Sequence, residues 1–143
     1  MAGSFTLRVI TPSSIVLDTS VESARFPGVD GSIGVLPRHA HMIASVGIGI
    51  LHYSERGQAK ALFVSEGFAE VKDNTMRVVC EAGELPEEID ETRAREAEKR
   101  ARERLSVKVI GEQAVDMLRA EMALQRALLR LETRGASRER VRS

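Results

Sequence analysis

Apolar and polar residues alternate along the first part of the chain. Phe5, Leu7 and Val9 alternate with Thr6, Arg8 and Ile10, the period-two pattern of a strand with one apolar face. At least eight short runs of this kind follow one another, separated by turn signals such as Arg56-Gly57 and Asp73-Asn74. The pattern predicts an antiparallel β-sandwich or barrel over residues 1–84. It disfavours a parallel βαβ fold, because no strand is followed by a helical segment.

The hydrophobic period becomes helical at Asp90. Three alanines, at positions 94, 97 and 101, share one face of a mostly charged segment, and a second helix is predicted over residues 112–133 after a break at 107–111. The second helix carries a coiled-coil seam made of Met117, Ala120, Leu124, Ala127 and Leu131. We therefore expect a linker at 85–89 and an antiparallel α-helical hairpin over 90–134. A helix end at Gly135 and a frayed tail over 135–143 would follow.

The predicted hairpin has little apolar surface to hold it closed. Burial contributes about 0.8 kcal/mol per methylene, so an alanine seam contributes much less than a leucine seam. The pattern therefore predicts a hairpin that can open.

The joint between the two parts is Ile89-Asp90-Glu91-Thr92-Arg93-Ala94. Asp90 suits a helix N-cap, and Ile89 and Ala94 stand where a hydrophobic staple is formed. The same residues also suggest a second interpretation, since a helix N-terminus beside Arg93 offers donors and positive potential to a phosphate group. The spacing alone leaves both interpretations open.

Composition excludes several classes of function. The net charge is zero, with 21 basic and 21 acidic residues, which disfavours a nucleic-acid-binding module built on the arginine-rich helices. Cys80 is the only cysteine and is expected in the core, so no internal disulfide forms. We find neither a signal-peptide pattern nor a membrane-spanning apolar run, so no direct membrane insertion is expected. No catalytic constellation is evident, and we expect no active site.

Two further groups of residues have competing interpretations. His39 and His41 have the spacing of a metal pair, but no second ligand cluster accompanies them, so no metal site is expected. Arginines recur every fourth residue at 126, 130, 134 and 138. This series is either a solvated helix face or a contact with an acidic protein surface.

Four segments, taken in order, resemble the epsilon subunit of F-type ATP synthase. They are Val9-Ile10-Thr11-Pro12, Gly31-Ser32-Ile33-Gly34-Val35-Leu36-Pro37-Arg38-His39-Ala40, Val64-Ser65-Glu66-Gly67-Phe68-Ala69-Glu70-Val71 and Ile89-Asp90-Glu91-Thr92-Arg93-Ala94. The resemblance covers nearly the whole chain. It implies a β-sandwich N-terminal domain followed by a helical hairpin, in a non-catalytic subunit of the central stalk of the proton-translocating enzyme.

The resemblance also implies partners and a regulatory role. The sandwich would dock on the gamma subunit and on the c-ring, with Ser32 and His39 at the interface. The hairpin would be a movable arm that reaches the alpha and beta subunits when extended and inhibits ATP hydrolysis. The subunit would lie peripheral to the membrane, on the cytoplasmic side of a bacterial inner membrane or its organellar equivalent.

Some members of this family bind ATP as a regulatory ligand, and no cofactor is otherwise required. The positions that match the family's site are Glu84, Ile89, Asp90, Arg93, Arg100, Arg126 and Arg130. The chain also departs from the family pattern, because Ser32 replaces a frequent acidic residue, His41 a usual proline and Glu66 a usual glycine. These departures bear on the chemistry of the docking surface.

Overall fold

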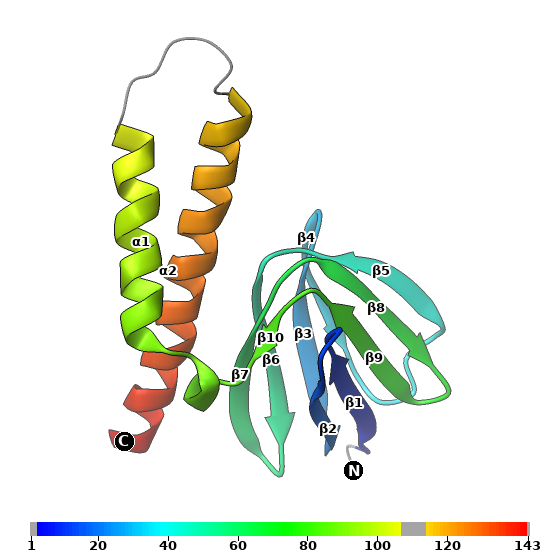
Figure 1. The fold of residues 1–143 in the computed structure, drawn as a ribbon. Coiled ribbons are helices and arrows are strands. Elements are labelled where there is room, and N and C mark those ends of the chain that lie inside the picture. The colour runs from blue at the N-terminus through cyan, green and yellow to red at the C-terminus, as the bar shows by residue number, and fades with distance from the viewer. Residues whose placement is uncertain (1–2, 107–113, 143) are drawn as a thin grey trace. The chain divides into compact units, whose positions relative to one another are not determined.

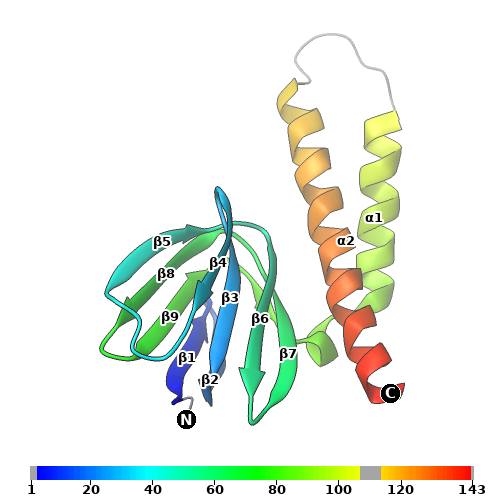
Figure 2. The same cartoon turned by 180° about the vertical axis from the view of Figure 1, so that it is seen from behind.

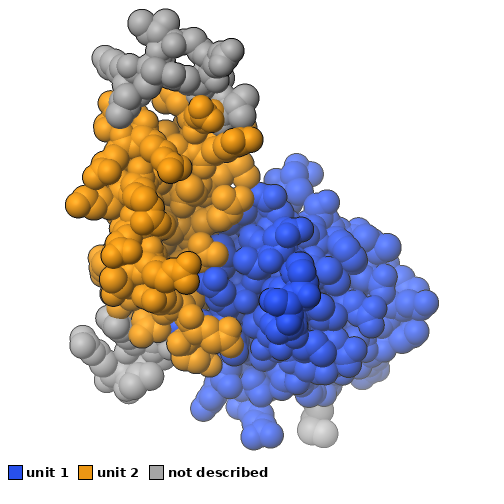
Figure 3. All heavy atoms as spheres, in the orientation of Figure 1, with its two compact units in different colours: residues 1–86 blue, residues 87–143 orange. Residues whose placement is uncertain are grey.

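The computed structural model describes residues 3–106 and 114–142, which form two compact units, 1–86 and 87–143 (Figure 3). The first unit is built of strands and the second of two helices (Figure 1). The predicted break at 107–111 lies outside the described residues. The change from strand to helix is confirmed, since a short 3-10 turn, Pro86–Glu88, precedes the first helix.

Ten strands lie within the described part of the first unit. They are β1 (Phe5–Ile10), β2 (Ile15–Val21), β3 (Ser23–Gly28), β4 (Gly31–Val35), β5 (Met42–Val46), β6 (Gly49–Glu55), β7 (Gln58–Val64), β8 (Gly67–Lys72), β9 (Thr75–Cys80) and β10 (Gly83–Glu84). Their order in the sheet is β10-β7-β6-β3-β5-β8-β9-β1-β2, with β4 paired to β3.

The sheet bends back on itself into a two-layered sandwich (Figures 1 and 2). Strand β2, at one end of the order, lies against β6 near the other end. A side-chain hydrogen bond from Thr19 Oγ1 to Glu55 Oε1 at 3.0 Å joins these two strands. The Glu22 amide, just after β2, donates to the Ser54 carbonyl at 2.9 Å and extends the pairing of β3 with β6.

One strand pair differs from the all-antiparallel prediction. Strand β1 pairs in parallel with β9, with Leu7 opposite Met76 and Val9 opposite Val78. A parallel neighbour needs a long crossover, which the intervening strands supply. The four facing side chains are 0 % exposed and lie in the core together with Phe5, so the predicted apolar face of the first strand is confirmed.

Two-residue turns set the register of two hairpins. Asp73 and Asn74, between β8 and β9, have φ of 52° and 58°, and Arg56 and Gly57, between β6 and β7, have φ of 52° and 77°. Positive φ at both central residues matches the twist of the flanking strands.

The second unit pairs helix α1 (Glu91–Ser106) with helix α2 (Ala114–Arg142) side by side (Figures 1 and 2). Among the helical residues whose burial is described, the buried apolar ones are alanines at positions 94, 101, 120 and 127, each at most 4 % exposed. The predicted small burial of the first helix is confirmed. Met117 is 41 % exposed, so its predicted place in the seam is wrong, while Leu124 and Leu131 are half-buried.

The second helix does not end at Gly135, as the sequence predicts, but continues to Arg142. A glycine inside a helix costs about 1 kcal/mol relative to alanine, and the chain that follows contains no proline to stop the helix. The predicted frayed tail is therefore replaced by helix as far as Arg142.

Candidate functional site

The loop between β4 and β5 carries the predicted interface residue His39. Arg38 has a φ of 61°, and its amide donates to Asn74 Oδ1 at 2.9 Å. Asn74 Nδ2 donates in turn to the Ser4 carbonyl at 2.9 Å. The side chain of Asn74 therefore ties this loop to the start of the chain and to the β8–β9 turn.

The two histidines of this loop do different things. His39 Nδ1 donates to the Ala40 carbonyl at 2.8 Å, since a carbonyl only accepts, and His41 Nε2 lies 3.7 Å from Asp73 Oδ1. In the part of the chain that the structure describes, no three His, Cys, Asp or Glu residues are grouped to hold a metal ion. Ser32, the other predicted interface residue, is exposed on β4 opposite Pro27.

Sequence reasoning treated Asn74 only as a turn residue. Its position in a two-residue connection between alternating strands was the available signal, because such turns require positive φ. The contact with Arg38, a residue 36 positions away, has no sequence signal.

The segment Ser65-Glu66-Gly67 holds strand ends together. Ser65 is 4 % exposed, its amide donates to the Ala82 carbonyl at 2.9 Å, and its Oγ accepts from the Ala82 amide at 2.8 Å. A Cβ atom at Gly67 would stand 1.9 Å from the Val79 carbonyl oxygen. This part of the resemblance is therefore explained by the fold, and the usual glycine that Glu66 replaces is not needed there.

At the joint, Asp90 caps α1 as predicted. Its Oδ1 accepts from the Arg93 amide at 3.1 Å, and its carbonyl accepts from the Ala94 amide at 3.0 Å. Ile89 and Ala94 are 3 % and 4 % exposed, as a hydrophobic staple requires. The capping interpretation is confirmed by these contacts.

The contacts of Arg134 show which residues of the two helices lie opposite each other. Its Nη1 donates to the Ile89 carbonyl at 2.9 Å, and its Nε lies 3.7 Å from Glu91 Oε2. Both helices rise by the same amount per residue. A step of one residue toward the start of α2 therefore corresponds to a step of one residue toward the end of α1. Arg130 is therefore level with residues 93–95 and Arg126 with residues 97–99.

The residues predicted for ATP binding fall into two groups. Glu84 lies in β10 of the first unit, whereas the other six belong to the second unit. Arg93 and Arg100 are exposed on α1, and Arg126 and Arg130 are half-buried on α2. The helix pairing brings Arg130 level with Arg93 and Arg126 close to the level of Arg100.

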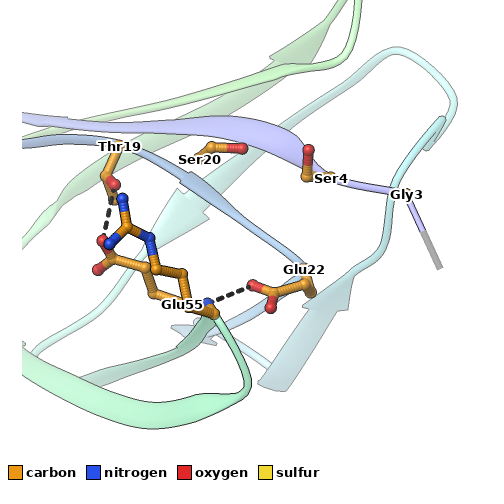
Figure 4. A pocket seen from close by; sticks show the side chains of 7 residues that line it. Gly3, Ser4, Thr19, Ser20, Glu22 and Glu55 are labelled. Carbon is orange, nitrogen blue, oxygen red and sulfur yellow. Dashed lines mark hydrogen bonds between the residues drawn. The ribbon is translucent and has the colours of Figure 1, made fainter.

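A pocket of about 370 Å³ lies at the open end of the sandwich, lined by Gly3, Ser4, Thr19, Ser20, Glu22, Glu55 and Arg56 (Figure 4). Its two carboxylates, Glu22 and Glu55, both accept hydrogen bonds from residues of the β6–β7 hairpin. Glu22 accepts from the amides of Arg56 and Gly57 at 3.2 and 2.8 Å. Hydrogen bonds from Lys60 and then from Thr19 lower the pKa of Glu55. The polar groups that line the pocket therefore stabilise the β6–β7 turn.

Cys80 lies in the core, as expected, and is 3 % exposed. Burial raises the pKa of its thiol to about 11, and its Sγ lies 3.8 Å from the Ile10 carbonyl. The thiolate, the reactive form, is therefore scarce at neutral pH. Separately, among the helical residues described, none forms a segment long and apolar enough to cross a membrane.

Comparison with known proteins matches both units. Residues 4–86 match the family of ATP synthase, Delta/Epsilon chain, beta-sandwich domain, and residues 87–135 match the long alpha-helix domain of the same chain. An ATP synthase epsilon chain of Nitratidesulfovibrio vulgaris is 43 % identical over 135 residues, covering 94 % of this chain and 98 % of the relative. That of Symbiobacterium thermophilum is 44 % identical over 131 residues, covering 91 % and 92 %.

The fold is also found in solved structures. A chain of the Euglena gracilis mitochondrial ATP synthase superposes with a TM-score of 0.73 at 22 % identity, covering 94 % of this chain and 81 % of that one. A chain of the Tetrahymena thermophila enzyme gives a TM-score of 0.61 at 13 % identity, covering 90 % and 95 %. At these identities the likeness shows the fold alone. The two consecutive family matches and the relatives above 40 % identity show that this chain belongs to the delta/epsilon-chain family of ATP synthase, a non-catalytic component of that enzyme.

Proposed function

We propose that the chain is the epsilon subunit of the central stalk of a rotary ATP synthase, where it couples rotation of the c-ring and gamma subunit to catalysis. The observation that carries this proposal is the match of both units, in order, to the two domains of one family. The similar structures belong to an OSCP/F1/c-ring assembly and to a central stalk with its c-ring. The subunit would lie peripheral to the membrane, on the cytoplasmic side in a bacterium.

The first unit would carry docking on gamma and the c-ring. The loop that holds His39 is fixed by the Asn74 hydrogen bonds, and Ser32 is exposed on β4. A fixed loop loses less conformational entropy on binding than a free one.

Copurification of the full chain with gamma and the c-ring tests the docking proposal. His39→Ala and Ser32→Arg should each weaken retention, and Gln58→Ala, an exposed change in another hairpin, should not. Retention of the double variant equal to that of the unchanged chain would contradict the placement of the interface. Failure of the unchanged chain to bind gamma would overturn the function itself.

The second unit would act as a movable arm that contacts the alpha and beta subunits and restrains ATP hydrolysis when extended. Its alanine seam supports this role, because the fully buried apolar side chains among the described helical residues are four alanines, each of which contributes a single methyl group. Assembled enzyme that lacks residues 87–143 should hydrolyse ATP faster than enzyme with the full chain. An unchanged rate would refute the inhibitory role.

ATP would be the regulatory ligand of the closed hairpin. Arg93 and Arg100 on α1 would combine with Arg126 and Arg130 on α2, together with the cap at Asp90 and the preceding Ile89. The height at which the helices pair supports this proposal, since arginines from both helices lie within about one turn of each other. Guanidinium groups suit phosphate through paired hydrogen bonds.

Binding would stabilise the closed state by RT ln(1 + [L]/Kd), about 2.7 kcal/mol at a hundredfold excess over Kd. Titration calorimetry of the full chain with ATP should therefore give heat that Arg93→Gln and Arg126→Gln reduce. Matched controls are Arg104→Gln and Arg119→Gln, exposed arginines on the same two helices. If millimolar ATP gives no heat, the joint does not bind ATP and serves only as the start of α1.

A further inference from the structure

Arg134 occupies a position of the helix seam itself. Ala120, Ala127 and Arg134 are spaced seven residues apart on α2, and Ala94 and Ala101 have the same spacing on α1. Residues seven apart lie on nearly the same face of a helix. The alanine seam of α2 is therefore continued, toward the joint, by an arginine.

The guanidinium of Arg134 meets groups of α1 and of the residue before its cap. Nη1 donates to the Ile89 carbonyl at 2.9 Å, and Nε is 3.7 Å from Glu91 Oε2. The side chains of Arg134 and Glu91 are 30 % and 25 % exposed, so solvent screens their attraction only in part. Arg95 donates to the other oxygen of Glu91 at 3.0 Å, which holds that carboxylate in place.

The alanines cannot fix the alignment of the helices by themselves. If one helix slid by seven residues along the other, about 10 Å, one of the two alanine pairs could form again, because the alanines repeat every seven residues on both helices. A polar residue in a seam selects one register, because other registers leave it without its partners. Among the described seam positions, Arg134 is the charged one, and it contacts the start of α1.

We propose that Arg134 is a clasp that selects the register of the closed hairpin and fastens it at the joint. This role goes beyond the proposed function, since it concerns how the closed state is chosen whether or not a nucleotide or an ATP synthase partner binds. Arg134 does not act as a cap of α2, because the helix continues two turns further to Arg142. The clasp acts between the helices.

Hydrogen exchange on the full chain tests the clasp, with the amides of residues 94–98, the first that donate within α1, as the readout. Arg134→Met keeps an apolar stem and removes the donors, and it should speed exchange of these α1 amides about tenfold, the effect of losing one charge-assisted hydrogen bond. Arg134→Lys keeps the positive charge but lacks the planar guanidinium group, so it should give an intermediate increase in the exchange rate. Arg119→Met, an exposed change on the same helix, is the matched control and should give none.

Spin labels test the register directly. Labels at Lys99→Cys and Leu128→Cys, in a Cys80→Ser background, should show one short distance in the chain with Arg134. Arg134→Met should add a second population displaced by about 10 Å. A single unchanged distance together with unchanged exchange at residues 94–98 would overturn the proposal, as would an equal effect of Arg119→Met.

A variant that loses helix would still give an answer. If Arg134→Met lowers the total helical circular dichroism, Arg134→Lys decides. An increase of about threefold in exchange at residues 94–98 supports the clasp, since the lysine ammonium can still donate one hydrogen bond to the Ile89 carbonyl. No increase overturns it. Calorimetry with ATP plays no part in these readouts, so failure of the clasp and failure of nucleotide binding are distinguishable.

Discussion

Replacement of Asn74 by alanine should destabilise the sandwich by about 2 kcal/mol. The change removes two side-chain hydrogen bonds, one from the Arg38 amide and one to the Ser4 carbonyl, each 2.9 Å long. Exposed bonds of this kind contribute about 0.5 kcal/mol each. Alanine at a φ of 58° adds about 1 kcal/mol of backbone strain, which asparagine tolerates better.

Tyr53 provides a clean assay for this unit. It is the only tyrosine, the chain has no tryptophan, and its side chain is 6 % exposed in the sandwich core. Urea unfolding followed by tyrosine fluorescence therefore reports the first unit, while circular dichroism at 222 nm is dominated by the helices. The shift in midpoint at constant slope gives the change in the free energy of unfolding.

Two further variants separate the contributions. Asn74→Gly loses both hydrogen bonds but accepts a positive φ, so it should recover about 1 kcal/mol relative to Asn74→Ala. Asp73→Asn, at the neighbouring turn position with a φ of 52°, is the control and should stay within about 0.5 kcal/mol of the original chain. A loss below about 0.5 kcal/mol for Asn74→Ala would refute the view that this side chain holds the loop.

Three other predictions follow from the first unit. Gly67→Ala should unfold the sandwich at room temperature or cost more than about 3 kcal/mol by tyrosine fluorescence, because the added carbon meets the backbone at Val79 rather than a movable side chain; a stable variant would contradict the packing. A chain of residues 1–86 should unfold cooperatively with the same Tyr53 signal, since the core strands and their closure all lie within it. Cys80 should resist thiol reagents at pH 8 in the folded chain; its pKa is raised to about 11, so its contribution to stability is complete below about pH 9 and is lost as the pH rises toward 11, which unfolding midpoints across that range can check.

The sequence by itself determined the kinds of element and where they change. Period-two alternation in Phe5, Leu7 and Val9 and helical spacing in Ala94 and Ala101 each reflect local geometry, so each is visible in a short window. The cap at Asp90 is local for the same reason, since its partner is the amide of a residue three positions away. The family resemblance was carried by motifs that the fold then explained.

Tertiary structure decided the contacts between distant positions. No short-range pattern in the sequence predicts three of these contacts. They are the parallel pairing of β1 with β9, the hydrogen bond from Asn74 to Ser4 across 70 positions and the contact of Arg134 with Ile89 across 45. The seam was only partly predictable: hydrophobicity favoured Met117, which is 41 % exposed, whereas Ala120 and Ala127 are buried. Small side chains let two helix backbones approach closely. How closely they approach depends on the packing of both helices, so the sequence of one helix alone does not determine it.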